Sequence, residues 1–117
     1  MATKDKEVAE IILEQMGGNH FVVMCGIKDM VYGHNENGDS WLRMKLPRNG
    51  SKANLLRITL NGKDLYDMEF LKVSYPKMKK DFTFSDYKET EVAVFEDVYC
   101  DQLAEIFEQT TKMYTKL

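Results

Sequence analysis

The fold is indicated most clearly by one alternating stretch, Ser40-Trp41-Leu42-Arg43-Met44-Lys45-Leu46. In an extended chain, its three apolar side chains point to one side, while Trp41, Arg43 and Lys45 point to the other. Residues 55–60 repeat the alternation, and the Asn61-Gly62 pair that follows is typical of a hairpin turn. The pattern therefore predicts antiparallel strands in a sheet with one covered face and one face open to water.

The residues before this stretch predict a helix, two strands and a hairpin loop. A helix is expected over residues 5–16, where apolar residues recur at helical spacing before Gly17-Gly18. The apolar run from His20 to Cys25 is interpreted as a buried strand, and Met30-Val31-Tyr32 as a short second strand. Residues 34–39 carry oxygen ligands at alternate positions, but they do not fit a calcium loop, so a hairpin loop is favoured.

The C-terminal half predicts further strands and a last helix. The strand that begins at Tyr66 changes its apolar phase near Phe70, which predicts either a bulge there or an early end of the strand. A minor strand is expected at residues 82–84 and another strand over residues 91–95. Asp97 is expected to cap a helix from Val98 to Tyr114. The buried stripe expected along this helix consists of Tyr99, Leu103, Ile106, Phe107, Thr110 and Tyr114.

These elements predict a single domain over residues 1–117 of the α+β class. Its expected architecture is an N-terminal helix, an antiparallel meander sheet of about five or six strands, and a C-terminal helix packed on one sheet face. The composition, 44% hydrophobic and 30% charged, excludes disordered and collagen-like chains. The longest apolar run, residues 21–27, is far shorter than the roughly 20 residues that span a bilayer. The charged N-terminus does not resemble a secretory signal, so we expect a cytoplasmic protein away from membranes.

The residues that usually carry chemistry are sparse. Cys25 and Cys100 are too few for a disulfide scaffold, and we expect both to be buried or half-buried free thiols. His20 and His34 complete a set of four zinc donors with no recognisable spacing, so neither a metal nor a cofactor is expected. Two pairs of strand carboxylates, at 67 and 69 and at 89 and 91, are more typical of solvated strand edges than of acid–base catalysis. The sequence therefore favours a protein that is not an enzyme.

The charges are unevenly distributed along the chain. The formal net charge is −3, yet residues 40–63 hold six lysines and arginines and no acid, between two acidic ends. Such a segment forms either a basic surface or a set of cations that acidic helices neutralise after folding.

Three stretches of the chain resemble a family of small phage, prophage and mobile-element proteins that has no assigned activity. They are the run from Ile12 to Phe21 (Ile-Leu-Glu-Gln-Met-Gly-Gly-Asn-His-Phe), the run from Ile58 to Phe70 (Ile-Thr-Leu-Asn-Gly-Lys-Asp-Leu-Tyr-Asp-Met-Glu-Phe), and the end of the chain from Val98 to Leu117. The resemblance covers nearly the whole chain and fits poorly over residues 34–40 and 75–90. It implies a phage or mobile-element source inside a host cell. It supplies no catalytic residues.

The candidate binding residues lie on the wet side of the expected sheet. Trp41, Arg43 and Lys45 share one strand face, Arg57 is expected on the adjoining strand, and Arg48 and Lys52 lie in the loop between them.

Two functions compete for these residues. The first is a non-enzymatic phage or mobile-element accessory protein that binds another protein, such as a host enzyme or defence component, because Trp and Arg are favoured interface anchors. The alternative is a module that binds single-stranded nucleic acid by stacking bases on Trp41 and meeting phosphates with the cations. A third reading is structural only, in which Trp41 packs under a helix or against the arginine stems. The pattern names no partner.

Overall fold

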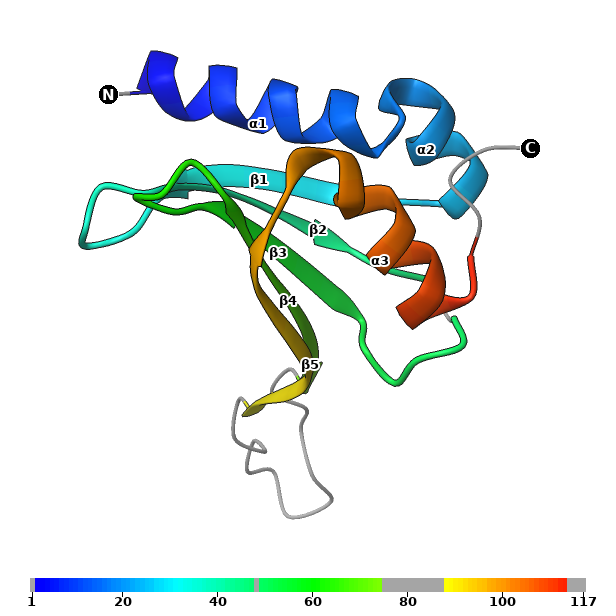
Figure 1. Ribbon diagram of the computed structural model, residues 1–117. Helices are drawn as coiled ribbons and strands as arrows, with labels where there is room; N and C mark the ends of the chain where they lie inside the picture. Colours follow the sequence, from blue (N-terminus) through cyan, green and yellow to red (C-terminus); the bar gives the residue numbers. More distant parts are fainter. Residues whose placement is uncertain (1, 48, 75–87, 114–117) are drawn as a thin grey trace, which may run out of the picture.

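The computed structural model describes residues 2–47, 49–74 and 88–113 of the 117-residue chain (Figure 1). Two helices come first, then five strands, and a short 3-10 turn (η1) leads into the last helix. Their bounds are α1 Ala2–Met16, α2 Gly18–Cys25, β1 Lys28–His34, β2 Ser40–Lys45, β3 Leu55–Leu60, β4 Tyr66–Ser74, β5 Lys88–Val98, η1 Cys100–Gln102 and α3 Leu103–Thr111.

The five strands form one antiparallel meander in the order β1-β2-β3-β4-β5. All three helices lie on the same side of this sheet, which we call the inner face, and the opposite side is the outer face (Figure 1). The predicted α+β architecture, with a terminal helix at each end of a meander sheet, is therefore confirmed. No helix among the described residues is long and apolar enough to cross a membrane.

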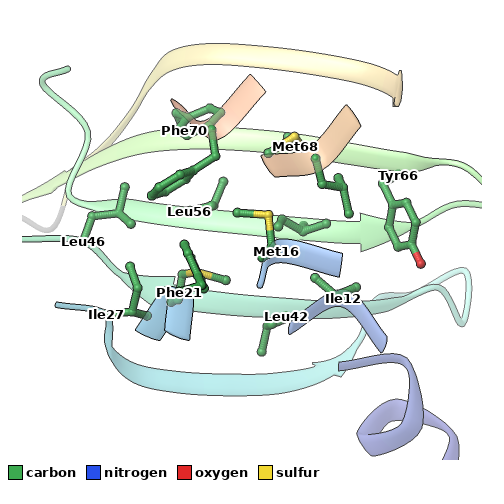
Figure 2. Close-up of a cluster of buried hydrophobic side chains, with 14 of the residues drawn as sticks. Ile12, Met16, Phe21, Ile27, Leu42, Leu46, Leu56, Tyr66, Met68 and Phe70 are labelled. Atoms are coloured by element: carbon green, nitrogen blue, oxygen red, sulfur yellow. The ribbon is translucent and has the colours of Figure 1, made fainter. Parts of the chain in front are cut away.

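The core lies between the inner face and the helices (Figure 2). Alternate residues of the middle strands point into it, because successive side chains of a strand face opposite sides. The strands contribute Leu42, Met44, Leu56, Ile58, Tyr66, Met68 and Phe70, and the helices contribute Ile12, Met16, Phe21, Leu103 and Phe107. Phe107 holds α3 in place through an edge-to-face contact with Phe21, their ring centroids 5.1 Å apart.

The prediction of a strand from His20 to Cys25 is wrong, because these residues form most of α2. Gly17 and Gly18, with φ of 122° and 63°, turn the chain sharply after α1. Phe21 and Cys25 then lie one helical turn apart and are both buried, while Val23 is 81% exposed. A short apolar run fits a buried strand and a buried helix equally well, so the sequence alone did not decide between them.

The last helix begins later than predicted. β5 continues to Val98, and α3 starts only at Leu103 after the turn of η1. Its buried residues are Leu103, Phe107 and Thr111, whereas Tyr99 is 61% exposed and Tyr114 lies outside the described residues. The predicted minor strand at residues 82–84 also lies outside them.

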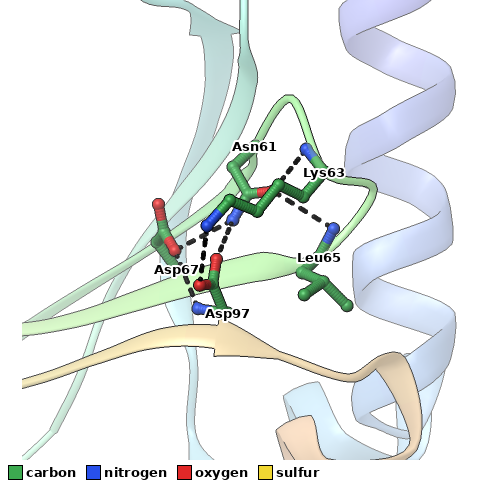
Figure 3. Close-up of polar contacts among 5 residues, drawn as sticks. All are labelled: Asn61, Lys63, Leu65, Asp67 and Asp97. Carbon is green, nitrogen blue, oxygen red and sulfur yellow. Dashed lines mark hydrogen bonds and ion pairs between the residues drawn. The ribbon is translucent and has the colours of Figure 1, made fainter.

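Asp97 is not a helix cap but the centre of a polar network that joins β5 to the β3–β4 hairpin (Figure 3). It has a φ of 55°, and its backbone N–H donates to the carboxylate of Asp67. Its own carboxylate accepts hydrogen bonds from Asn61 and Lys63. The Asn61 side chain also accepts the backbone N–H groups of residues 63 and 65, which closes the predicted hairpin turn.

Of the two other local predictions for the sheet, the hairpin loop is confirmed and the bulge lies elsewhere. β4 pairs with β3 without interruption through Phe70 and Leu71, and the extra residue at the Phe70–Leu71 register shift is Val92 of β5. The apolar phase of β4 changes because Leu71 and Val73 are buried in a separate cluster on the other face. Residues 34–39 form a hairpin loop, in which the side chain of Asn35 accepts the backbone N–H groups of Asn37 and Asp39.

One buried carboxylate ties α1 to the first hairpin. Asp5 is 6% exposed and accepts hydrogen bonds from His34 Nδ1 and Ser40 Oγ, both at 2.8 Å. These two bonds lower the pKa of Asp5 below its ordinary value.

This lowered pKa predicts a specific acid sensitivity. The stabilisation that Asp5 provides is complete above the ordinary pKa of an aspartate, and it is lost as the pH falls through the lower pKa of the folded state. We therefore expect the native chain to lose more of its free energy of unfolding on acidification than the Asp5→Asn variant does. Urea unfolding from neutral to acidic pH measures both losses, and equal losses would contradict this prediction.

Candidate functional site

The outer face gathers four of the six candidate residues. Alternation on β2 places Trp41, Arg43 and Lys45 on the side opposite the buried Leu42 and Met44. The β2–β3 register pairs Arg43 with Arg57, so these two side chains share that side. The outer face thus carries an indole and three cations on two neighbouring strands.

Trp41 is half-buried and lies against the edge strand. It pairs with Gly33 of β1, and a Cβ atom added to Gly33 would approach the Trp41 Cζ2 atom to 2.9 Å. Only a glycine therefore leaves room for the indole at this position. The Arg43 guanidinium lies 5.9 Å from the centre of the ring, within the range of a cation–π contact. The indole is therefore half-buried, and Gly33 and Arg43 hold it in one position.

Arg57 is held by carboxylates. Its Nε and second terminal nitrogen donate to the two oxygens of Glu69 at 3.0 and 2.8 Å, the bidentate geometry of a strong ion pair. A carboxylate oxygen of Glu89 lies 3.9 Å from the same guanidinium. The side chains of Arg57 and Glu69 are 31% and 22% exposed, so solvent only partly screens the pair.

The contact with Glu89 shows that the outer face is concave. Glu89 pairs with Val73, four residues along β4 from Glu69. In a flat sheet its Cα would lie about 16 Å from that of Arg57, from two strand spacings of about 4.8 Å and four residues of about 3.3 Å each. Both side chains would have to be fully extended along that diagonal to meet, whereas Arg57 is turned toward Glu69, so the contact indicates that the β4–β5 ribbon curls toward the outer side. Figure 1 shows β4 and β5 bending away from the helices, and the bulge at Val92 supplies the bend.

This curl buries a second, smaller apolar cluster on the outer face. Leu55, Leu71 and Val73 form it, separate from the main core. Together with the indole, these three side chains form an apolar surface on the concave face, next to the ion pairs of Arg57.

Of the remaining candidate cations that the structure describes, neither Lys45 nor Lys52 lies beside Trp41. Lys45 lies 3.7 Å from the carboxylate of Asp29. Lys52 is exposed in the loop after β2, at the opposite end of that strand from Trp41, and Arg48 lies outside the described residues. The loop folds toward α3, since the backbone N–H of Gly50 donates to the carbonyl of Thr111 at 2.7 Å.

The loop is also pinned to the sheet by Asn54. The side chain of Asn54 donates to the carbonyl of Val73 and accepts its N–H, at 2.9 and 2.8 Å. Its backbone N–H donates to the carbonyl of Leu71. Asn54 therefore continues the pairing with β4 beyond the end of β3.

The charges of the outer face are mixed and not simply basic. Asp67 and Glu69 face outward from β4, opposite Thr59 and Arg57, and Glu91 lies opposite Leu71. Among the described cations of residues 40–63, Lys45, Arg57 and Lys63 pair with acids of β1, β4 and β5. The sequence alone left open a basic surface or neutralisation by the acidic helices. The sequence did not identify Gly33 as the residue against which the indole packs. It also did not identify Glu69 and Glu89 as the partners of Arg57.

The serine and the histidine beside Asp5 are not arranged as a nucleophile and its base. Ser40 and His34 both donate to Asp5, so neither is placed to activate the other. Cys25 is buried, and burial raises the pKa of its thiol. Cys100 is exposed, which corrects the expectation that it is buried or half-buried. Among the described residues, no group of three or more His, Cys, Asp or Glu side chains is placed to hold a metal ion.

No family model matches this chain, and neither a curated protein nor a solved structure matches it. The site is therefore interpreted from its own geometry.

Proposed function

We propose that this protein is a non-enzymatic accessory protein of a phage or mobile element that binds another protein on its outer face. The observation that carries the proposal is the fixed Trp41–Arg43 pair beside the Arg57–Glu69 ion pair, on a concave surface that none of the described helices covers (Figure 1). Tryptophan and arginine are enriched among residues that dominate protein interfaces. The sequence resemblance supplies the phage or mobile-element source and leaves the partner, such as a host enzyme or defence component, to experiment.

The mixed charge favours a protein partner over a nucleic acid. A phosphate backbone gains affinity from cations that are free to replace its counterions. On the outer face Arg57 is held by two carboxylates, and Asp67 and Glu91 add further negative charge. A protein surface can match both signs of charge, which a polyanion cannot.

The proposal predicts that the partner is lost when Trp41 is truncated. The bait is the purified chain, the source is a host-cell lysate, and the matched control is Tyr99→Ala, which removes an exposed aromatic ring from the segment between β5 and η1. We expect Trp41→Ala and Arg43→Glu each to weaken capture of the retained protein by about 30-fold, the equivalent of about 2 kcal/mol for an interface anchor. Tyr99→Ala should retain the partner at native affinity.

A circular-dichroism spectrum and urea unfolding of each variant establish that it is folded. Equal capture by Trp41→Ala and the native chain would contradict the proposal. So would strong quenching of the Trp41 fluorescence by single-stranded oligonucleotide with an affinity that falls steeply as salt rises, since that result defines the nucleic-acid alternative.

A further inference from the structure

The two edge strands of the described sheet are protected by similar devices. β5 carries Lys88, Glu89, Glu91 and Glu96 around an uncharged segment, residues 92–95, and β1 carries Lys28 and Asp29 before an uncharged segment, residues 30–33. The pairing of each edge strand with its neighbour also contains a register shift. β1 has the larger exposed apolar side chains, since Met30, Val31 and Tyr32 are each 41–45% exposed. The β1 edge therefore offers more apolar surface to a pairing strand.

A groove runs along this open edge on the inner side. It has a volume of about 210 Å³ and lies between α1 and β1. Its walls include Leu13 of α1, Met30 and Tyr32 of β1, and Leu42 of β2, with Lys6 and Glu10 of α1 at the same groove. A strand that paired with β1 would place alternate side chains in this groove.

We propose that the β1 edge pairs with the β1 edge of a second copy of this chain, so that two five-stranded sheets join into one. A two-fold axis perpendicular to the sheet pairs the strands antiparallel and keeps inner face with inner face. When the two-fold axis passes near Tyr32, the apolar side chains that enter the groove come from β1 of the second copy. Met30 and Tyr32 of each copy then lie in the shared groove, and Val31 of one copy lies opposite Gly33 of the other, beside its Trp41.

The position of α1 fits this arrangement. α1 packs on both β1 and β2, so its axis lies roughly half a strand spacing inside the edge. Two β1 strands at about 4.8 Å would therefore place the two α1 helices on the order of 10 Å apart, at the upper end of the distance at which helices pack. In the joined sheet the two helices would thus lie at a distance compatible with packing.

The charges on the facing sides of the helices are complementary. Asp5 bonds to His34, so α1 and β1 run in opposite directions from that contact. A rise of about 3.3 Å per strand residue and about 1.5 Å per helix residue places Ala9 beside Tyr32. Around an axis there, Lys6 of one copy lies within reach of Glu10 of the other, and the pair occurs twice. This complementarity favours a second copy over an unrelated strand.

The test is the oligomeric state of the purified chain and of charge variants of α1, measured by sedimentation equilibrium across a dilution series. We expect the native chain to have the mass of two copies. Lys6→Glu and Glu10→Lys should each raise the dissociation constant by about tenfold or more, because each brings like charges together across the two-fold axis. The double variant Lys6→Glu/Glu10→Lys restores opposite charges and should dimerise nearly as tightly as the native chain.

A second pair of variants tests the strand edge. Tyr32→Lys puts a charge on the open edge and should yield monomers. Val92→Lys makes the matched change on β5, where Val92 is 39% exposed, and should leave the dimer intact. A native chain that is monomeric throughout the series would overturn the proposal, as would a dimer that none of the α1 or Tyr32 variants weakens. Trp41 lies beside the joined edge, so the sedimentation series also includes Trp41→Ala. If this variant keeps the native dissociation constant and loses the captured partner, the loss tests the proposed function separately from the dimer.

Discussion

Replacing Phe107 by alanine is expected to lower the free energy of unfolding by about 3–5 kcal/mol, the usual cost of removing a fully buried aromatic ring. Phe107 has no exposed surface, and its ring meets Phe21 edge-to-face and lies 6.5 Å from the ring of Phe70. It is therefore the side chain through which α3 contacts both α2 and the sheet. Urea unfolding followed by circular dichroism measures the loss.

The matched control for this substitution is Ile11→Ala on α1. Ile11 is 47% exposed, so its truncation should change the free energy of unfolding by no more than about 0.5 kcal/mol. A loss below about 1 kcal/mol for Phe107→Ala would mean that the core closes around the missing ring, or that α3 contributes little to the stability of the sheet.

Replacing Asn54 by alanine is expected to cost about 2–3 kcal/mol, which is large for a polar residue in a loop. The substitution removes two hydrogen bonds and leaves the N–H and carbonyl of the buried Val73 without these partners. It should also loosen the apolar cluster of Leu55, Leu71 and Val73 on the outer face. Denaturant unfolding at neutral pH gives the loss directly.

The Asn54→Asp variant distinguishes the contributions of the two hydrogen bonds to the free energy of unfolding. An aspartate keeps the oxygen that accepts the Val73 N–H and loses the group that donates to its carbonyl, so we expect an intermediate stability. Asn37→Ala, in the exposed loop after β1, is the control that removes an asparagine side chain without these bonds. If Asn54→Ala and Asn37→Ala lose the same stability, the bridge to β4 contributes nothing.

The strands and their faces could be predicted because alternation is a local property. Residues 40–46 and 55–60 carry their orientation in the sequence, and the Asn61-Gly62 turn joins β3 to β4 as expected. The change of apolar phase near Phe70 is visible in the sequence, but its cause is tertiary, because Leu71 and Val73 are buried on the outer face and the bulge lies opposite them in β5.

The wrong predictions arose where tertiary packing decides. Residues 20–25 are apolar enough for either element, and the positions of α1 and of the sheet select a helix. In the sequence, Asp97 follows residues with a strand pattern and precedes residues with a helical pattern, which is the position of a helix N-cap. In the structure its contacts with Asn61 and Asp67, distant in sequence, keep it in β5 instead.

The partners of Arg57 differ in how far the sequence could have revealed them. The hairpin is centred near Lys63, and a hairpin with that centre pairs Arg57 with Glu69, so this ion pair was accessible from the turn alone. Glu89 reaches Arg57 only because the β4–β5 ribbon curls, and no local pattern encodes the extent of that curl.

The glutamates of β5 bear on assembly beyond the proposed dimer. A chain with two open edges could add copies end to end without limit and form fibres. In the proposed β1–β1 pairing, both ends of the joined sheet would be β5 strands. Their Glu89, Glu91 and Glu96 side chains would place like charges against any further copy that paired through the same strand.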